Sequence, residues 1–186
     1  VLARTFATTP RAVVYGRKGN YHRAGTPPWI LGYEGAGEVV SAPAGCALVP
    51  GQRVGFADSP FSNAELCAVD IDRLVPLPDE VSFETAAGSL LQGLTAQYLC
   101  RDSHAVRDGD WAVVHAAGGG VGLLLTQILR HLGARVVGIA STEAKRQAAR
   151  AAGAAFVLTT ACWAEALKPI TGGRGADVVY DSVGTT

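Results

Sequence analysis

The sequence predicts an α/β protein in which a β-rich amino-terminal domain precedes a doubly wound parallel sheet. Residues 111–142 read as an apolar strand, a glycine turn, an apolar helix and a second strand, and residues 155–181 continue with strand, helix and strand. The first half instead holds short apolar stretches separated by glycine and proline, as all-β domains do. We therefore expect two domains, at residues 1–85 and 86–186.

Short strands make up the expected amino-terminal domain. Residues 35–41 and 53–56 alternate or cluster apolar side chains, and prolines and glycines mark the turns around them. The pattern changes at Ser82, which precedes helical periodicity and can accept a hydrogen bond as the N-cap of that helix. The predicted helix continues to Leu99 and leads into the second domain.

Strands and helices alternate through the second domain. After the strand, helix and strand of residues 111–142, the sequence predicts a third strand at 155–158, a short helix at 163–167 and a fourth strand at 177–181. Parallel strands need crossover connections, and these are usually helices. The alternation therefore predicts a parallel sheet with helices on its faces.

A glycine turn joins the first of these strands to its helix. Val113 and Val114 are apolar on both faces of the strand, as a parallel sheet covered by helices requires. Residues 118–120 are expected to adopt φ values that a Cβ forbids, so that the chain turns tightly and its amides approach a pyrophosphate. Gly122 leaves room for the helix to pack on the strand, and the first free amides of the helix complete the anion site.

This turn fits a dinucleotide-binding fingerprint with alanine at the first glycine position. A glycine-rich hexamer alone is weak support, but here it lies between an apolar strand and an apolar helix, with a second strand at the right distance. The alternative is a glycine-rich turn in a fold that no longer binds a cofactor. The residues expected to contact the cofactor are Ala117, Gly119, Gly120, Val121 and Gly122.

The end of the second strand indicates which dinucleotide binds. An NAD site usually has Asp or Glu there, accepting hydrogen bonds from the ribose 2′-hydroxyl. This chain has Ser141 and Thr142, followed by Lys145 and Arg146. Hydroxyls and cations suit a 2′-phosphate, so the sequence predicts NADPH. The alternative is that Ser141 or Thr142 caps a helix over residues 143–152 whose cations face solvent.

Composition and charge limit the function classes. The 186 residues are 48% hydrophobic and carry no net charge, which favours a globular protein without a nucleic-acid partner. No apolar run reaches the roughly 18 residues of a membrane span. The 4 cysteines are dispersed without a Cys-x-x-Cys pair, as expected of a reducing, cytoplasmic location. The acid-free residues 1–33 leave a mitochondrial import remnant as the alternative.

Several words of the sequence carry a family resemblance. They include ILGYEGAGEVV at 30–40, PGQRV at 50–54, HAAGGGVG at 115–122 and TGGRGADVVYDSVG at 171–184. They occur in family order over nearly the whole chain, and the chain is identified by them as a member of the medium-chain dehydrogenase/reductase superfamily. Within it the chain resembles the zinc-independent quinone oxidoreductases related to zeta-crystallin. The resemblance implies a partial GroES-like domain followed by a partial Rossmann domain.

The resemblance implies an enzyme without a metal. Zinc alcohol dehydrogenases have a histidine before the glutamate of the first word, because imidazole nitrogen binds the catalytic zinc, and this chain has Tyr33 there. The implied reaction is hydride transfer from NADPH to a quinone or an α,β-unsaturated carbonyl. For such electrophiles the protein orients the rings, excludes water and donates hydrogen bonds to the developing oxyanion.

The resemblance also implies residues near the nicotinamide. It places Thr95 and Tyr15 at the catalytic centre and Gln92 beside the cofactor. From the residues alone, Thr95 can instead satisfy a backbone carbonyl of its own helix, and Gln92 can face solvent. His104 follows Asp102 and Ser103, but adjacent residues on a loop rarely converge into a triad.

The chain departs from the family pattern in two loops and in length. Mostly small or apolar residues occupy 9–13, where the family has an acid or amide, and Thr159 and Thr160 follow the third strand in place of an aromatic residue. We expect a chain truncated at both ends, with low activity alone and with a second copy or larger assembly covering the strand at 177–181. The alternative function is a non-catalytic, reductase-like subunit acting as a binding or scaffolding module.

Overall fold

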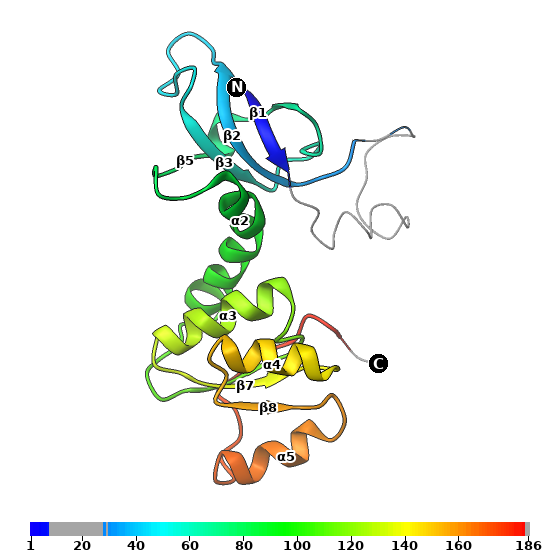
Figure 1. Ribbon diagram of the computed structural model, residues 1–186. Coiled ribbons are helices and arrows are strands. Elements are labelled where there is room, and N and C mark those ends of the chain that lie inside the picture. Colours follow the sequence, from blue (N-terminus) through cyan, green and yellow to red (C-terminus); the bar gives the residue numbers. More distant parts are fainter. Residues whose placement is uncertain (8–27, 29, 185–186) are drawn as a thin grey trace. The chain divides into compact units, whose positions relative to one another are not determined.

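The computed structural model describes residues 1–7, 28 and 30–184. The chain divides into two compact units, Val1–Leu91 and Gln92–Thr186. The division falls inside helix α2 (Phe83–Tyr98), which contributes residues to both units (Figure 1). Among the described residues, no helix has the length and hydropathy needed to cross a membrane.

The first unit contains an antiparallel sheet in the order β4-β1-β2-β3-β5. Its core gathers buried apolar side chains from several strands, including Val39, Val54 and Phe56. A short 3₁₀ helix, Ile71–Arg73, precedes the last strand. The strands are β1 (Leu2–Ala7), β2 (Glu34–Ser41), β3 (Arg53–Ala57), β4 (Leu66–Ala68) and β5 (Leu74–Pro76).

Glycine in β2 permits close packing inside this sheet. A Cβ at Gly35 would lie 2.7 Å from Cζ of Phe56, and a Cβ at Gly37 would meet the carbonyl oxygen of Arg4. Both positions therefore need a residue without a side chain. The glycine-rich word around residue 35 is thus explained by packing within the sheet.

The second unit contains a parallel sheet in the order β8-β7-β6-β9. Ala112 and Val114 pack with α3 and α4 in one core cluster, whereas Trp111 and Val113 pack with Leu167 of α5 in another. Helices therefore cover both faces of the sheet. The elements are β6 (Trp111–Val114), α3 (Gly120–His131), β7 (Arg135–Ile139), α4 (Glu143–Ala151), β8 (Phe156–Leu158), α5 (Trp163–Ile170) and β9 (Val178–Tyr180).

The strand order and helix placement confirm the predicted β-rich domain followed by a doubly wound sheet. Ser82 is the N-cap predicted for the long helix, since its Oγ accepts a hydrogen bond from Thr85 N at 3.1 Å. A π-helical turn, Leu99–Ser103, follows that helix. The fourth strand, β9, is shorter than the predicted 177–181. Asp177 Oδ2 accepts a hydrogen bond from Trp111 N of β6, and Asp181 Oδ1 accepts one from Val183 N.

Candidate functional site

The glycine turn between β6 and α3 is tied to the neighbouring strand. Ala117 N donates to the carbonyl oxygen of Ile139 at 3.0 Å, and Gly119 N donates to that of Ala116 at 2.8 Å. Ala116 has a φ of 49°, in the left-handed region that most residues avoid. The tight turn is therefore made by an alanine immediately before the fingerprint.

The expectation that residues 118–120 use φ values forbidden to a Cβ is wrong. None of these glycines has a positive φ, and the N-cap Gly119 has a φ of −95°. The glycines are needed because other atoms approach closely. A Cβ at Gly118 would lie 2.6 Å from Cβ of Lys145, and a Cβ at Gly122 would meet the carbonyl oxygen of Ala116. Spacing in the sequence identifies these positions, but only the packing shows why they exclude a side chain.

The amino-terminal end of α3 is suited to an anion. Its N-cap is Gly119, which has no side chain to accept a hydrogen bond from the first amides. Those amides have no intrahelical partner, and they lie at the positive end of the helix dipole. Gly120 is exposed and Val121 is half-buried, so the turn is accessible to a ligand.

The carboxyl end of β7 meets the first turn of α4 beside the same glycine turn. Ser141, Thr142 and Lys145 are all exposed there. Thr142 Oγ1 accepts a hydrogen bond from Lys145 N at 3.4 Å, so the predicted alternative of a helix cap is confirmed. Capping occupies one lone pair of a hydroxyl that has two, so Thr142 can still bind a ligand. The contact between Gly118 and the backbone and Cβ of Lys145 brings the base of this side chain beside the glycine turn.

Arg146 is held in one orientation at the end of β7. Its Nη1 lies 3.3 Å from the carbonyl oxygens of both Ala140 and Ser141, and its Nε donates to Oε2 of Glu143 at 2.9 Å. Nη1 of Arg150 donates to Oε1 of the same carboxylate at 3.0 Å. These two hydrogen bonds lower the pKa of Glu143, with that from Arg150 the larger cause.

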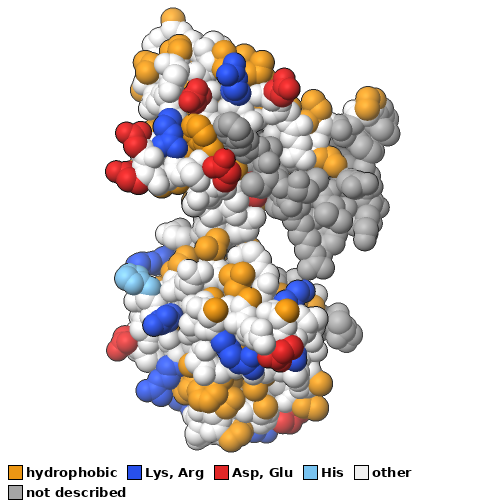
Figure 2. All heavy atoms as spheres, viewed as in Figure 1, with side chains coloured by type: hydrophobic (Ala, Val, Ile, Leu, Met, Phe, Trp, Pro, Cys, Tyr) orange, Lys and Arg blue, Asp and Glu red, His pale blue; other side chains and the backbone are white. Residues whose placement is uncertain are grey.

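Sequence reasoning missed Glu143 and Arg150 as parts of this site. The signal was present, because residues three and seven apart lie on one helix face, where opposite charges attract. Figure 2 shows basic and acidic side chains next to one another in the region of α4.

Gln92 and Thr95 lie on the part of α2 that belongs to the second unit. A Cβ at Gly120 would lie 3.3 Å from Cγ of Gln92, so the Gln92 side chain borders the start of α3. Thr95 is exposed, and its spacing from Gln92 puts both residues on the same helix face. Tyr15, the other expected catalytic residue, lies outside the described residues.

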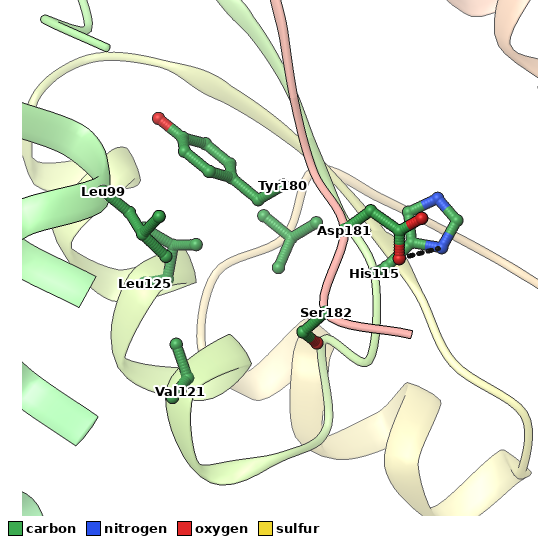
Figure 3. A pocket seen from close by; sticks show the side chains of 8 residues that line it. Leu99, His115, Val121, Leu125, Tyr180, Asp181 and Ser182 are labelled. Carbon is green, nitrogen blue, oxygen red and sulfur yellow. Dashed lines mark ion pairs between the residues drawn. The ribbon is translucent and has the colours of Figure 1, made fainter. Parts of the chain in front are cut away.

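A small pocket lies at the carboxyl edge of the parallel sheet, beside the glycine turn (Figure 3). Its volume is about 70 Å³, and Val121, Tyr180, Asp181 and Ser182 are among its lining residues. Burial is the main cause that raises the pKa of Tyr180 to about 12. Hydrogen bonds from the backbone N–H groups of the residues at 183 and 184 lower the pKa of Asp181.

His115 and Asp181 meet at this edge. Nδ1 of His115 lies 3.7 Å from Oδ1 of Asp181, and the imidazole makes an edge contact with Trp163 at a centroid distance of 4.9 Å. Sequence reasoning missed this pair. Each residue directly follows a strand of the parallel sheet, β6 or β9, and the carboxyl ends of such strands are where ligands bind in open α/β folds. That placement was the available signal.

Tyr33 directly precedes a buried carboxylate in the sequence. Glu34 is fully buried, and its Oε2 accepts a hydrogen bond from Leu91 N at 3.1 Å. The described residues contain no group of three or more His, Cys, Asp or Glu side chains that could hold a metal ion. The geometry therefore assigns Glu34 a structural contact with α2.

Family models match both units. Residues 4–109 match the alcohol dehydrogenase GroES-like domain, and residues 120–186 match the zinc-binding dehydrogenase family. A 2-haloacrylate reductase from Burkholderia is 38% identical over 180 residues, covering 88% of this chain and 54% of the relative. A quinone oxidoreductase from Pseudomonas aeruginosa is 39% identical over 174 residues, covering 91% of this chain and 53% of the relative.

Solved structures show the same likeness. The quinone oxidoreductase of Escherichia coli, in complex with NADPH, has a TM-score of 0.91 at 36% identity and covers 98% of this chain and 57% of its own. That of Pseudomonas syringae has a TM-score of 0.92 at 34% identity and covers 100% of this chain and 58% of its own. The chain thus spans about half the length of the curated relatives it matches.

Proposed function

The chain belongs to the medium-chain dehydrogenase/reductase superfamily and matches its alcohol dehydrogenase GroES-like and zinc-binding dehydrogenase domains. On this premise, we propose that the chain binds NADPH and works as a quinone or enone reductase. The observation that carries the proposal is the contact of Gly118 with the backbone and Cβ of Lys145, because it brings the first turn of α4 beside a turn whose free amides suit a pyrophosphate. The NADPH complex of the Escherichia coli relative supports the choice of cofactor.

The proposed cofactor contacts follow the cofactor from one end to the other. Hydroxyls and cations at the start of α4 meet the 2′-phosphate, the turn before α3 meets the pyrophosphate, and α2 borders the nicotinamide. The residues of the first group are Ser141, Thr142, Lys145 and Arg146. The residues proposed to contact the pyrophosphate are Ala117, Gly119, Gly120, Val121 and Gly122. Gln92 and Thr95 are proposed to lie beside the nicotinamide. The proposed catalytic residues are Thr95 and Tyr15.

The proposed chemistry needs no metal. When bound, the reduced nicotinamide supplies a hydride to an electron-poor carbon of the substrate. The chain's own groups bind and orient: amides at the start of α3 neutralise phosphate charge, and a threonine hydroxyl at Thr95 can donate a hydrogen bond to a developing oxyanion. The names of the relatives support this substrate class, since quinones and haloacrylates both contain a carbon–carbon double bond conjugated to a carbonyl group.

We propose further that the protein works as an oligomer or in a larger assembly, in the cytoplasm. Among the described residues, β9 pairs only with β6, and its Val179 side chain is 46% exposed. A strand with one unpaired edge can pair with another chain. The dispersed cysteines, which are free in this structure, are typical of a reducing compartment.

Titration of the chain with NADPH and with NADH tests the proposed function. Trp111 and Trp163 lie in the second unit, so their fluorescence should be quenched as the cofactor binds. We expect the Kd for NADPH to be lower than the Kd for NADH by a factor of roughly 10, as one charge-assisted hydrogen bond would produce. Absence of binding by both cofactors would exclude a dinucleotide site in this chain, and equal binding would exclude a 2′-phosphate site.

A further inference from the structure

Three charged residues of α4 form a connected ion-pair group. Glu143 Oε2 lies 2.9 Å from Nε of Arg146, and its Oε1 lies 3.0 Å from Nη1 of Arg150. The two arginines differ in exposure, because 19% of the Arg146 side chain and 51% of the Arg150 side chain is accessible to solvent. Arg146 is also held by backbone carbonyl groups, whereas Arg150 lies one turn further along the helix.

The carboxylate of Glu143 lies where its negative charge would repel a 2′-phosphate. It follows Thr142 directly and belongs to the first turn of α4, at the end of the second strand of the sheet. A carboxylate in this region of a dinucleotide fold accepts hydrogen bonds from the ribose 2′-hydroxyl and repels a phosphate at the same place. With its charge exposed, Glu143 would favour NADH and oppose the cations beside it.

Arg150 removes this conflict. It satisfies the carboxylate oxygen that Arg146 does not bind, so the group of three residues carries one net positive charge, where Glu143 and Arg146 alone would carry none. Resting on the proposed binding of NADPH, we infer that Arg150 is a positioning residue for cofactor specificity, which acts through Glu143 to keep the site open to a 2′-phosphate. Arg150 itself makes no contact with the cofactor in this inference.

Adenosine 2′,5′-bisphosphate and adenosine 5′-monophosphate are suitable probes, because they differ only in the 2′-phosphate. Their Kd values for the chain can be measured by calorimetry at low salt, where screening of exposed charges is weak. Arg150→Gln should raise the Kd of the bisphosphate about threefold, the size typical of one exposed ion pair, and leave that of the monophosphate unchanged.

A second background separates action through Glu143 from direct action. In Glu143→Gln, the amide oxygen still accepts from Arg146, and no charge remains for Arg150 to neutralise. Arg150→Gln in that background should therefore leave the Kd of the bisphosphate unchanged. Lys168→Gln is the matched control, since it removes one positive charge from α5 of the same unit and should change neither Kd. Circular dichroism verifies that each variant is folded.

The outcomes distinguish the inference from the proposed function. If the wild-type chain discriminates between the probes but Arg150→Gln binds the bisphosphate normally, Arg150 has no role in specificity and the inference fails alone. The same loss in both backgrounds would mean that Arg150 acts directly on the phosphate, which also overturns it. If the wild-type chain binds both probes equally or binds neither, the proposed 2′-phosphate site is wrong and the inference fails with it.

Discussion

Lys145, in the first turn of α4, lies directly against Gly118, since a Cβ at Gly118 would lie 2.6 Å from the Cβ of Lys145 and 2.7 Å from its carbonyl oxygen. The contact joins the turn before α3 to the first turn of the next helix. Two parts of the proposed cofactor site, one for the pyrophosphate and one for the 2′-phosphate, are thereby placed side by side.

Gly118→Ala should push these two parts away from each other. The added methyl group would meet backbone and side-chain atoms of Lys145, so we expect a loss of about 1–3 kcal/mol in the free energy of unfolding, together with weaker NADPH binding. Chemical denaturation and fluorescence titration measure the two effects. Gly93→Ala is the control, because nothing lies within 4 Å of a Cβ there and alanine should stabilise α2. Equal stability of the two variants would contradict the close contact.

Lys145→Ala should weaken NADPH selectively. A charge-assisted hydrogen bond contributes about 1.5–3 kcal/mol, so the Kd for NADPH should rise roughly tenfold or more while that for NADH stays nearly constant. The control is Lys168→Ala, on α5. A parallel loss for both cofactors would show that Lys145 supports the turn and does not contact a 2′-phosphate.

Asp177 should stabilise the second unit in a pH-dependent way. The hydrogen bond from Arg174 is the main cause that lowers the pKa of this carboxyl, and the N–H of Trp111 adds to it. A lowered pKa means that the stabilisation is fully present above the ordinary carboxyl range and is lost as pH falls through the folded-state value. Asp177→Asn should therefore be less stable than wild type at pH 7, and the two unfolding free energies should converge in acid. A constant difference across that range would exclude the charge as the cause.

Tyr180 should resist ionisation. Its pKa is raised to about 12, mainly by burial, and its hydroxyl oxygen is a buried atom without a hydrogen-bond partner among the described residues. The unfolded chain releases this proton near pH 10, so stability should fall as pH rises from there towards 12. Tyr180→Phe should remove that part of the alkaline loss and change stability at pH 7 by no more than about 1 kcal/mol. Stability curves for the two proteins that remain parallel in alkali would contradict the assignment.

Purified protein should hold no stoichiometric zinc. Tyr33 occupies the position where a metal-binding histidine would be expected, and phenol is a poor zinc ligand beside imidazole and thiolate. Elemental analysis of a folded sample, before and after dialysis against a chelator, measures this directly. About one zinc per chain, lost together with the folded state, would require a metal site.

The sequence was sufficient for the elements and for their helix caps, because those features depend on local chemistry. Ser82 and Thr142 cap their helices as their residue type predicts, and the glycine positions before α3 follow from spacing. The roles of the proposed contacts at Lys145 and Arg146 stay predictions. The ion pairs of Glu143 could have been predicted from helical spacing, but were not considered.

The tertiary structure alone decided which distant residues meet. His115 and Asp181 are far apart in the sequence, and they come within 3.7 Å because β6 and β9 pair in parallel and end at the same edge. The reason for glycine at residue 118 likewise lies in a helix that starts much later in the chain. Periodicity and turn chemistry fix what each segment becomes, whereas strand pairing and packing fix its neighbours, and those neighbours determine the geometry of the site.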